Sequence, residues 1–174
     1  QRALALVALS TTVIASIVLL IKVKSDGIQV VTLGSWPAPF GISMVSDMLS
    51  VLLVLSSTVI AFFVVWYSFS SIGKARESFF YYPGILFMLT GVNGAFTTGD
   101  IFNMFVFFEV LLMSSYLLIV LGGEKNQLQE SIKYILVNVI SSALFVITVA
   151  YLSSVVGTLN MADISVKIAQ IEQP

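Results

Sequence analysis

The chain has 174 residues, of which 58% are hydrophobic and 10% are charged, and its formal net charge is −1. A soluble domain of this length carries far more polar residues, so the composition predicts an all-α integral membrane protein with the lipid bilayer as its solvent. The near-neutral charge argues against a nucleic-acid partner, and the chain contains neither cysteine nor histidine. We therefore expect no metal, haem or other cofactor, and any proton chemistry must use carboxylates, lysines and water.

Hydropathy and helix-breaking residues divide the chain into five segments of membrane length. A helix rises about 1.5 Å per residue, so about 20 apolar residues cross the hydrocarbon core. Asp47 and Asp100 each stand just before such a segment, where a carboxylate accepts hydrogen bonds from the free amides of a helix start. Gly122 and Gly157 mark two helix ends. We predict transmembrane helices over residues 3–21, 48–69, 79–96, 101–121 and 128–155.

Two shorter segments are not expected to cross the membrane. Residues 28–45 contain β-prone runs on both sides of a Gly- and Pro-rich stretch, which predicts a small surface β-hairpin with Trp36 at the level of the lipid headgroups. Residues 160–171 place apolar side chains on one face and charged side chains on the other. This pattern predicts an interfacial amphipathic helix with Asn160 as its cap.

The basic residues suggest how the helices are oriented. If the helices alternate in direction, five basic residues lie on or near one membrane face and three on the other: Arg2, Lys74, Arg76, Lys125 and Lys133 against Lys22, Lys24 and Lys167. Short loops rich in lysine and arginine stay on the cytoplasmic side. We therefore predict that the loops at residues 73–78 and 122–127 are cytoplasmic and that the hairpin is external.

Glu109 is the main candidate for a functional residue. It stands near the middle of the otherwise uncharged segment 101–121. An ionisable side chain at the centre of a membrane helix costs about 2.5–3.5 kcal/mol on insertion scales, so it usually faces a bundle interior or a wet cavity and carries ion or proton traffic. The alternative is a structural carboxyl group, kept neutral by burial and hydrogen-bonded to a serine or a backbone carbonyl.

Lys133 is the second candidate, with two interpretations. It lies early in the segment 128–155, so its ammonium group can extend to the cytoplasmic interface and pair with Glu130 three residues before it. Alternatively, water links it to Glu109, and the two groups titrate together. A depth difference of roughly 10 Å between them argues against a direct salt bridge.

The other polar residues of the segments have commoner structural roles. Asp47 and Asp100 are better explained as helix caps than as ligands. Four polar residues can wet a cavity around Glu109, although hydrogen bonding between helices is their commoner role: Asn103, Ser114, Ser115 and Asn138. Small residues at positions 91, 95 and 99 predict a close helix–helix approach and imply no chemistry.

Three stretches of the sequence are similar to a known family. Residues 91–123 have the sequence GVNGAFTTGDIFNMFVFFEVLLMSSYLLIVLGG, Ser131 begins SIKY, and Gly157 begins GTLNMAD. Together they resemble the proton-translocating antiporter-like subunits of respiratory complex I and of Mrp-type multisubunit Na+/H+ antiporters. The residues are most similar to the D subunit of the Mrp antiporters, and the resemblance extends over the whole chain, including the hairpin.

The resemblance implies a fragment of a larger transporter. The family has about fourteen membrane helices with two inverted five-helix repeats, and this chain resembles the N-terminal part of that single domain. Glu109 matches the family's essential mid-membrane glutamate, and Lys133 matches a lysine of the following helix. The family's main partner lysine would follow Pro174, and a chain that opens at Gln1 without methionine is also expected to be a fragment.

The implied function is proton translocation in a multisubunit Na+/H+ antiporter of the bacterial cell membrane. The expected partners are other membrane subunits, protons, Na+ and lipid, and the expected activity is transport without enzymatic catalysis. Two alternatives remain: a proton-pumping membrane subunit of a complex I-like NADH dehydrogenase, and a scaffold subunit that does not transport.

Overall fold

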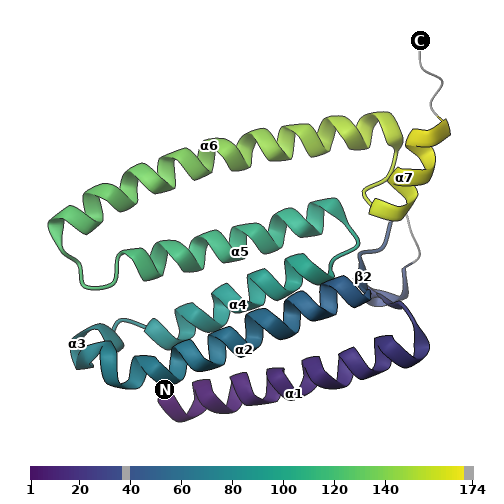
Figure 1. Cartoon of the computed structure of the whole chain (residues 1–174). Coiled ribbons are helices and arrows are strands. Elements are labelled where there is room, and N and C mark those ends of the chain that lie inside the picture. Colours follow the sequence, from purple (N-terminus) through teal and green to yellow (C-terminus); the bar gives the residue numbers. More distant parts are fainter. Residues whose placement is uncertain (37–39, 171–174) are drawn as a thin grey trace.

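The computed structural model describes residues 1–36 and 40–170, apart from the side chain of Ala75. Long helices run back and forth in a row through these residues, each roughly antiparallel to the next (Figure 1). We call the end of the bundle that carries the turn at residues 122–124 the loop end, and the opposite end the hairpin end. The predicted helical membrane class and its small two-stranded sheet are confirmed.

The row follows the chain order. Helix α4 packs against α1, α2 and α5, and α6 packs along α5 and against α7. Short α3 (Gly73–Glu77) connects α2 to α4 at the loop end, and α7 (Met161–Gln170) lies across the hairpin end (Figure 1). The long helices are α1 (Arg2–Asp26), α2 (Met48–Ser71), α4 (Tyr81–Thr97), α5 (Ile101–Ile119) and α6 (Lys125–Val156).

Four of these helices, α1, α2, α5 and α6, are long and apolar enough to cross a membrane within the described part of the chain. The predicted count of five is not confirmed, because α4 has only 17 residues, about 26 Å of helix. It begins later than predicted, after Phe80, which adopts a left-handed conformation (φ 63°). Its core residues Tyr82, Ile85 and Leu89 pack with Leu9 of α1 and Val65 of α2.

Aspartates cap two helices as the sequence predicts. Asp47 Oδ1 accepts a hydrogen bond from Ser50 N (2.7 Å), and Ser50 Oγ accepts one from Asp47 N (2.9 Å). The bond from the Ser50 amide lowers the pKa of the Asp47 carboxyl, because it stabilises the ionised form. Asp100 Oδ1 accepts a hydrogen bond from Asn103 N (2.7 Å) at the start of α5. Both carboxylates therefore act as N-caps, Asp47 for α2 and Asp100 for α5.

A small hairpin follows α1. Strand β1 (Gln29–Thr32) pairs antiparallel with β2 (Ser43–Ser46), with Val31 opposite Met44. Leu33–Ser35 form a 3-10 turn, and Trp36 is exposed. The predicted hairpin also includes residues 37–39, and the predicted amphipathic helix includes Ile171; both lie outside the described residues.

Backbone hydrogen bonds tie three segments together at the hairpin end. Gly99 N donates to Ser43 O (2.8 Å), Ile101 N donates to Leu159 O (2.9 Å), and Met161 N donates to Gly99 O (2.9 Å). Asn160 Nδ2 adds a hydrogen bond to Ser43 Oγ (2.9 Å). These bonds form what we call the hairpin-end lock, and they hold the start of α5 next to the end of α6.

Glycines of α4 let α5 approach closely. A Cβ atom at Gly91 would lie 2.7 Å from Leu111 N and 2.8 Å from Phe107 O, and one at Gly94 would overlap the Phe107 ring. Contact through Gly91 agrees with the predicted packing role, whereas Gly99 lies against Ser43 and Val45 of the hairpin. Phe107 and Leu111 of α5 contact α4. A different face of α5 therefore packs against α6.

Candidate functional site: a carboxylate between helices

Glu109 lies half-buried in the middle of α5 and faces α6. The hydroxyl of Ser142 on α6 donates a hydrogen bond to Glu109 Oε1. The two residues are 33 positions apart in the sequence, so the packing of α5 on α6 brings them together. The sequence does not single out Ser142, although the interpretation of Glu109 as a structural carboxyl group includes a serine partner of unspecified position.

Two hollows meet at Glu109. One, of about 450 Å³, lies beside α4 and is lined by Gly84, Phe87 and Ser114 among other residues. The other, of about 600 Å³, lies between α5 and α6 and includes Tyr116 and Ser142. Glu109 therefore borders space on two sides of its helix.

The contacts between α5 and α6 change in character along the helices. Toward the hairpin end, the rings of Phe105 and Phe145 stack, with their centroids 5.7 Å apart and an interplanar angle of 14°. Glu109 and Ser142 come next. Toward the loop end, the rings of Tyr116 and Tyr134 meet edge-to-face with centroids 5.6 Å apart.

Asn138 belongs to the polar half of this interface. It lies one turn from Ser142 on α6 and next to the Tyr116 hydroxyl of α5. Its amide nitrogen Nδ2 is buried, and the polar group beside it is the Tyr116 hydroxyl. Of the four residues expected to wet a cavity around Glu109, Asn138 lies at this interface. The sequence signal for the group is the four-residue spacing of Tyr134, Asn138 and Ser142, which places them on one helix face.

Lys133 does not meet Glu109 directly. Its Nζ lies 2.7 Å from Glu130 Oε1, and both side chains are exposed. Nine residues separate Lys133 from Ser142 on α6, a rise of about 13 Å, so Lys133 sits well toward the loop end. Of the two interpretations offered by the sequence, the structure has the local pair with Glu130 and no direct contact with Glu109.

The remaining candidate residues form hydrogen bonds within their own helix or the adjoining loop. Asn103 Nδ2 donates to Thr98 Oγ1 (2.9 Å) at the hairpin end. Ser114 and Ser115 donate to carbonyls of α5, those of Val110 (2.7 Å) and Leu112 (2.8 Å). Ser114 also lines the hollow beside α4. None of the described residues forms a cluster of three or more metal-ligating side chains.

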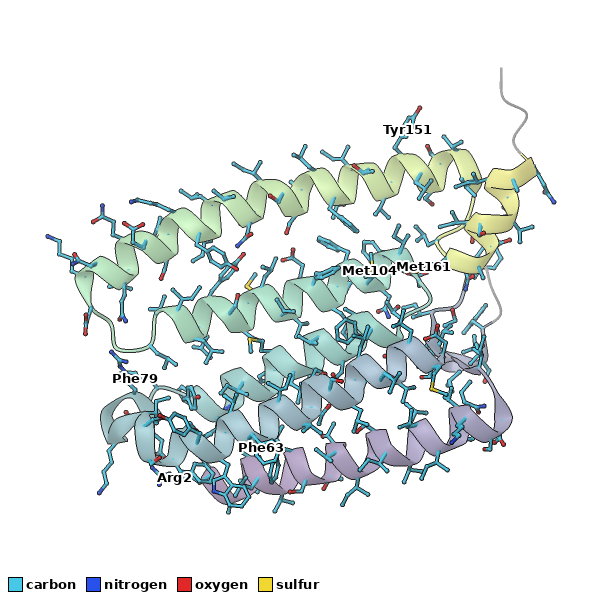
Figure 2. The ribbon with its side chains drawn as sticks, viewed as in Figure 1. Arg2, Phe63, Phe79, Met104, Tyr151 and Met161 are labelled. Carbon is cyan, nitrogen blue, oxygen red and sulfur yellow. The ribbon has the colours of Figure 1, made fainter. Side chains whose placement is uncertain are left out.

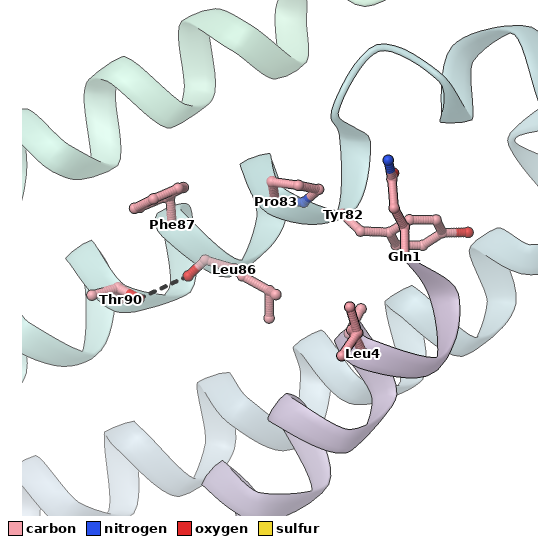
Figure 3. A pocket seen from close by; sticks show the side chains of 8 residues that line it. Gln1, Leu4, Tyr82, Pro83, Leu86, Phe87 and Thr90 are labelled. Atoms are coloured by element: carbon pink, nitrogen blue, oxygen red, sulfur yellow. Dashed lines mark hydrogen bonds between the residues drawn. The ribbon is translucent and has the colours of Figure 1, made fainter.

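A further pocket, of about 360 Å³, lies between α1 and α4 (Figure 3). Leu4, Leu86 and Phe87 give it an apolar lining, and its threonine, Thr90, donates its hydroxyl to Leu86 O (2.9 Å) within α4. The described lining contains no carboxylate and no lysine, so this pocket offers no proton chemistry comparable to that of Glu109.

The comparisons with known proteins all indicate the same family. Residues 98–173 match the family described as "NADH:quinone oxidoreductase/Mrp antiporter, TM". The chain is 47% identical to the D subunit of the Na(+)/H(+) antiporter of Alkalihalophilus pseudofirmus, over 99% of this chain and 35% of that protein. It is 55% identical to the D subunit of the Bacillus subtilis antiporter, over 92% of this chain and 33% of that protein.

Two solved structures are similar over nearly the whole chain. The archaeal membrane-bound sulfane sulfur reductase, a respiratory membrane complex, matches with a TM-score of 0.92 and 27% identity, over 98% of this chain and 35% of that one. The Mrp complex of a Dietzia species matches with a TM-score of 0.82 and 28% identity, over 97% and 34%. The chain thus spans about a third of the length of the relatives it matches.

Proposed function

Because the chain belongs to the family of membrane subunits shared by NADH:quinone oxidoreductase and Mrp antiporters, we propose that it is part of the D subunit of a Na+/H+ antiporter and moves protons through Glu109. The bacterial relatives and the apolar helices identify a multi-pass protein of the cell membrane. The names of the relatives support antiport, and the Mrp complex supports partnership with other membrane subunits. Na+ and protons are the proposed substrates.

The observation that carries the proposal is the setting of Glu109. It lies in the middle of α5, borders two hollows and receives a hydrogen bond from Ser142. An ionisable side chain at the centre of a membrane helix usually marks a path for ions or protons, and this position suits a proton carrier.

The proposal assigns subordinate roles to α4 and Lys133. We place α4 in the membrane as a short fifth span, because α2 and α5 enclose it and supply its apolar surroundings. The five helices then form the N-terminal part of one antiporter-like domain. Lys133 contributes a positive charge near the loop end of α6, where it acts on Glu109 through water.

The test replaces Glu109 in the full-length subunit within the assembled complex. Glu109→Gln should reduce Na+-dependent proton movement in inverted membrane vesicles to background, because glutamine cannot carry a proton. Glu109→Asp should retain part of the activity. The matched control is Glu124→Gln, since Glu124 is an exposed carboxylate whose distance from Arg76 is 3.9 Å. Wild-type transport by an assembled Glu109→Gln complex would refute the proposal.

The similarity to the sulfane sulfur reductase complex supports a second candidate, a proton-pumping subunit of a respiratory complex. Co-purification with redox subunits, and proton pumping that needs an electron donor, would favour this function over antiport. A third hypothesis is a scaffold that does not transport. It predicts that Glu109→Gln disrupts assembly on native gels, whereas a proton carrier predicts intact assembly without transport.

A further inference from the structure

A hollow of about 380 Å³ lies among α1, α2, α4 and α5, and we call it the hydroxyl hollow. Its lining combines apolar side chains with four hydroxyl groups and one amide: Thr12 and Ser16 of α1, and Thr90, Asn93 and Thr97 of α4. Thr12 and Ser16 flank the midpoint of α1, so their hydroxyl groups lie near the membrane centre. Unlike the two hollows at Glu109, this hollow has no ionisable side chain in its described lining.

The four hydroxyl groups of the lining share one hydrogen-bonding pattern. Each donates its hydrogen to a carbonyl oxygen of its own helix: Thr12 to Ala8 (2.8 Å), Ser16 to Val13 (2.8 Å), Thr90 to Leu86 (2.9 Å) and Thr97 to Asn93 (2.9 Å). A carbonyl oxygen only accepts hydrogen bonds, so the hydrogen of each hydroxyl group is already used. The hydroxyl oxygens keep free lone pairs, and they can therefore act only as acceptors toward a ligand in the hollow.

Helix α2 fixes the amide of Asn93. Ser57 Oγ donates a hydrogen bond to Asn93 Oδ1 (2.7 Å), and Asn93 Nδ2 donates one to Thr58 Oγ1 (3.3 Å). Both partners lie near the middle of α2, and Thr58 is fully buried. These bonds hold the amide in one orientation. Its oxygen has two lone pairs and uses one for Ser57, so a second remains for a ligand.

A lining of neutral acceptor oxygens suits a small cation with a single charge. Hard cations take oxygen ligands, and polar groups at the membrane centre often mark ion paths. The described residues gather no three carboxylate, histidine or cysteine side chains, so a doubly charged metal ion would lack the charged ligands that offset its loss of water. Neutral oxygens can replace part of the water shell of a singly charged ion.

We propose that the hydroxyl hollow is a Na+ site, in which the oxygens of Thr12, Ser16 and Asn93 bind the ion together with water. This inference rests on the proposed function in Na+/H+ antiport. It assigns Na+ to a hollow that Glu109 does not line, so the ion and the proton have separate sites in this part of the subunit.

Protection of a cysteine by Na+ tests the site without depending on transport. Ala15 lines the hollow and offers no side-chain oxygen, so Ala15→Cys leaves the proposed ligands in place. The cysteine is introduced into an otherwise cysteine-free full-length subunit in the assembled complex, and a small methanethiosulfonate reagent is added in NaCl, KCl or choline chloride of equal ionic strength. Na+ should slow labelling severalfold relative to choline, because the bound ion occupies the hollow. Lys24→Cys, at an exposed position of the same helix, should react equally in all three salts.

Two adjacent threonines of α1 provide the matched variants for transport. Thr12 lines the hollow, whereas Thr11 is exposed and donates its hydroxyl to Val7 O (2.8 Å). Thr12→Val should raise the Na+ concentration for half-maximal exchange about tenfold, because one oxygen ligand of a charged group is lost. Thr12→Ser should restore the wild-type value, and Thr11→Val should leave it unchanged.

Several outcomes would overturn the Na+ site. Equal labelling of Ala15→Cys in NaCl and choline chloride would show that Na+ does not occupy the hollow, and equal slowing by K+ would contradict a site for Na+. Absence of labelling in every salt would show that another group, such as a lysine from the rest of the subunit, fills it. These results leave the role of Glu109 untouched. Conversely, full transport by Glu109→Gln with intact Na+ protection of Ala15→Cys would reject the proton carrier and retain the Na+ site.

Discussion

Arg2 and Glu77 form a two-pronged ion pair at the loop end, with Nε 2.7 Å from Oε1 and Nη2 2.6 Å from Oε2. The pair joins the start of α1 to α3, which are 75 residues apart in the sequence. The Arg2 guanidinium also lies over the Phe69 ring, 5.4 Å from its centroid. One arginine therefore connects α1, α2 and α3.

The pair predicts a pH-dependent contribution to stability. Hydrogen bonding from Arg2 lowers the pKa of the Glu77 carboxyl, so the pair stabilises the fold above the ordinary carboxyl range and is lost as the pH falls through the lowered pKa. Glu77→Gln should therefore lower the melting temperature of the purified protein in detergent at neutral pH. The difference from wild type should vanish in acid. An equal difference at both pH values would contradict an ionic contribution.

The distribution of basic residues predicts the orientation. We expect the turn at residues 122–127 and the α3 region to face the cytoplasm. In intact cells, Lys125→Cys should resist a membrane-impermeant thiol reagent, whereas in inverted vesicles it should react readily. Trp36→Cys should behave in the opposite way, because Trp36 lies in the exposed hairpin at the other end of the bundle (Figure 1). Labelling of Lys125→Cys from outside intact cells would reverse the assignment.

Substitution of Lys133 distinguishes two roles: a charge that is coupled to Glu109, and a side chain that only pairs with Glu130. If its charge acts on Glu109 through water, Lys133→Gln should slow exchange and shift its pH optimum. If only the pair with Glu130 matters, exchange should remain near normal, because exposed ion pairs contribute only about 0–1 kcal/mol. Glu130→Gln is the matched control, since it removes the pair and keeps the lysine. Near-normal exchange by Lys133→Gln would remove Lys133 from the pathway.

We predict that substitution of Gly91 disturbs helix packing and removes no chemical group of the site. Gly91→Ala would bring a Cβ atom to 2.7 Å from Leu111 N, so α4 and α5 must separate, at a cost of about 1–3 kcal/mol. The melting temperature should fall, and transport should decline because α5 carries Glu109. Thr90→Ala is the control, since Thr90 is an exposed neighbour whose hydroxyl bonds to its own helix. Unchanged stability in Gly91→Ala would show that the two helices adjust freely.

Local features of the fold can be predicted from the sequence, and long-range ones cannot. Asp47 and Asp100 cap helices through bonds to residues three positions away, which follow from sequence spacing alone. The Lys133–Glu130 pair is equally local and is one of the two interpretations that the sequence offers. The Glu109–Ser142 contact depends on how two helices rotate about their axes. That rotation is set by packing that α4 imposes on α5 through its glycines.

The outer faces of the bundle show a second limit of sequence reasoning. Tyr151 projects away from the bundle on the outer face of α6, and apolar side chains cover much of that face (Figure 2). Hydropathy predicts that these residues avoid water. It does not distinguish a face that meets lipid from one that meets another helix, because both surroundings are equally apolar. The predicted start of α4 is two residues too early, since hydropathy does not reveal the left-handed residue Phe80 before it.

The hairpin-end lock fixes one end of α6, so a tilt of this helix displaces each residue in proportion to its distance from that end. Hydrogen bonds around Gly99, Leu159 and Asn160 hold one end of α6 to α5, whereas the connection at the loop end runs through Gly122 and Gly123, both with positive φ angles (111° and 65°). Ser142 lies about 21 Å along the helix axis from Val156, the last residue of α6, and Tyr134 lies about 33 Å from it. A small tilt of α6 would therefore separate Tyr134 from Tyr116 by roughly one and a half times as much as it separates Ser142 from Glu109. The mouth of the interface would widen most, and the contact between the carboxylate and its hydroxyl partner would loosen by a smaller amount.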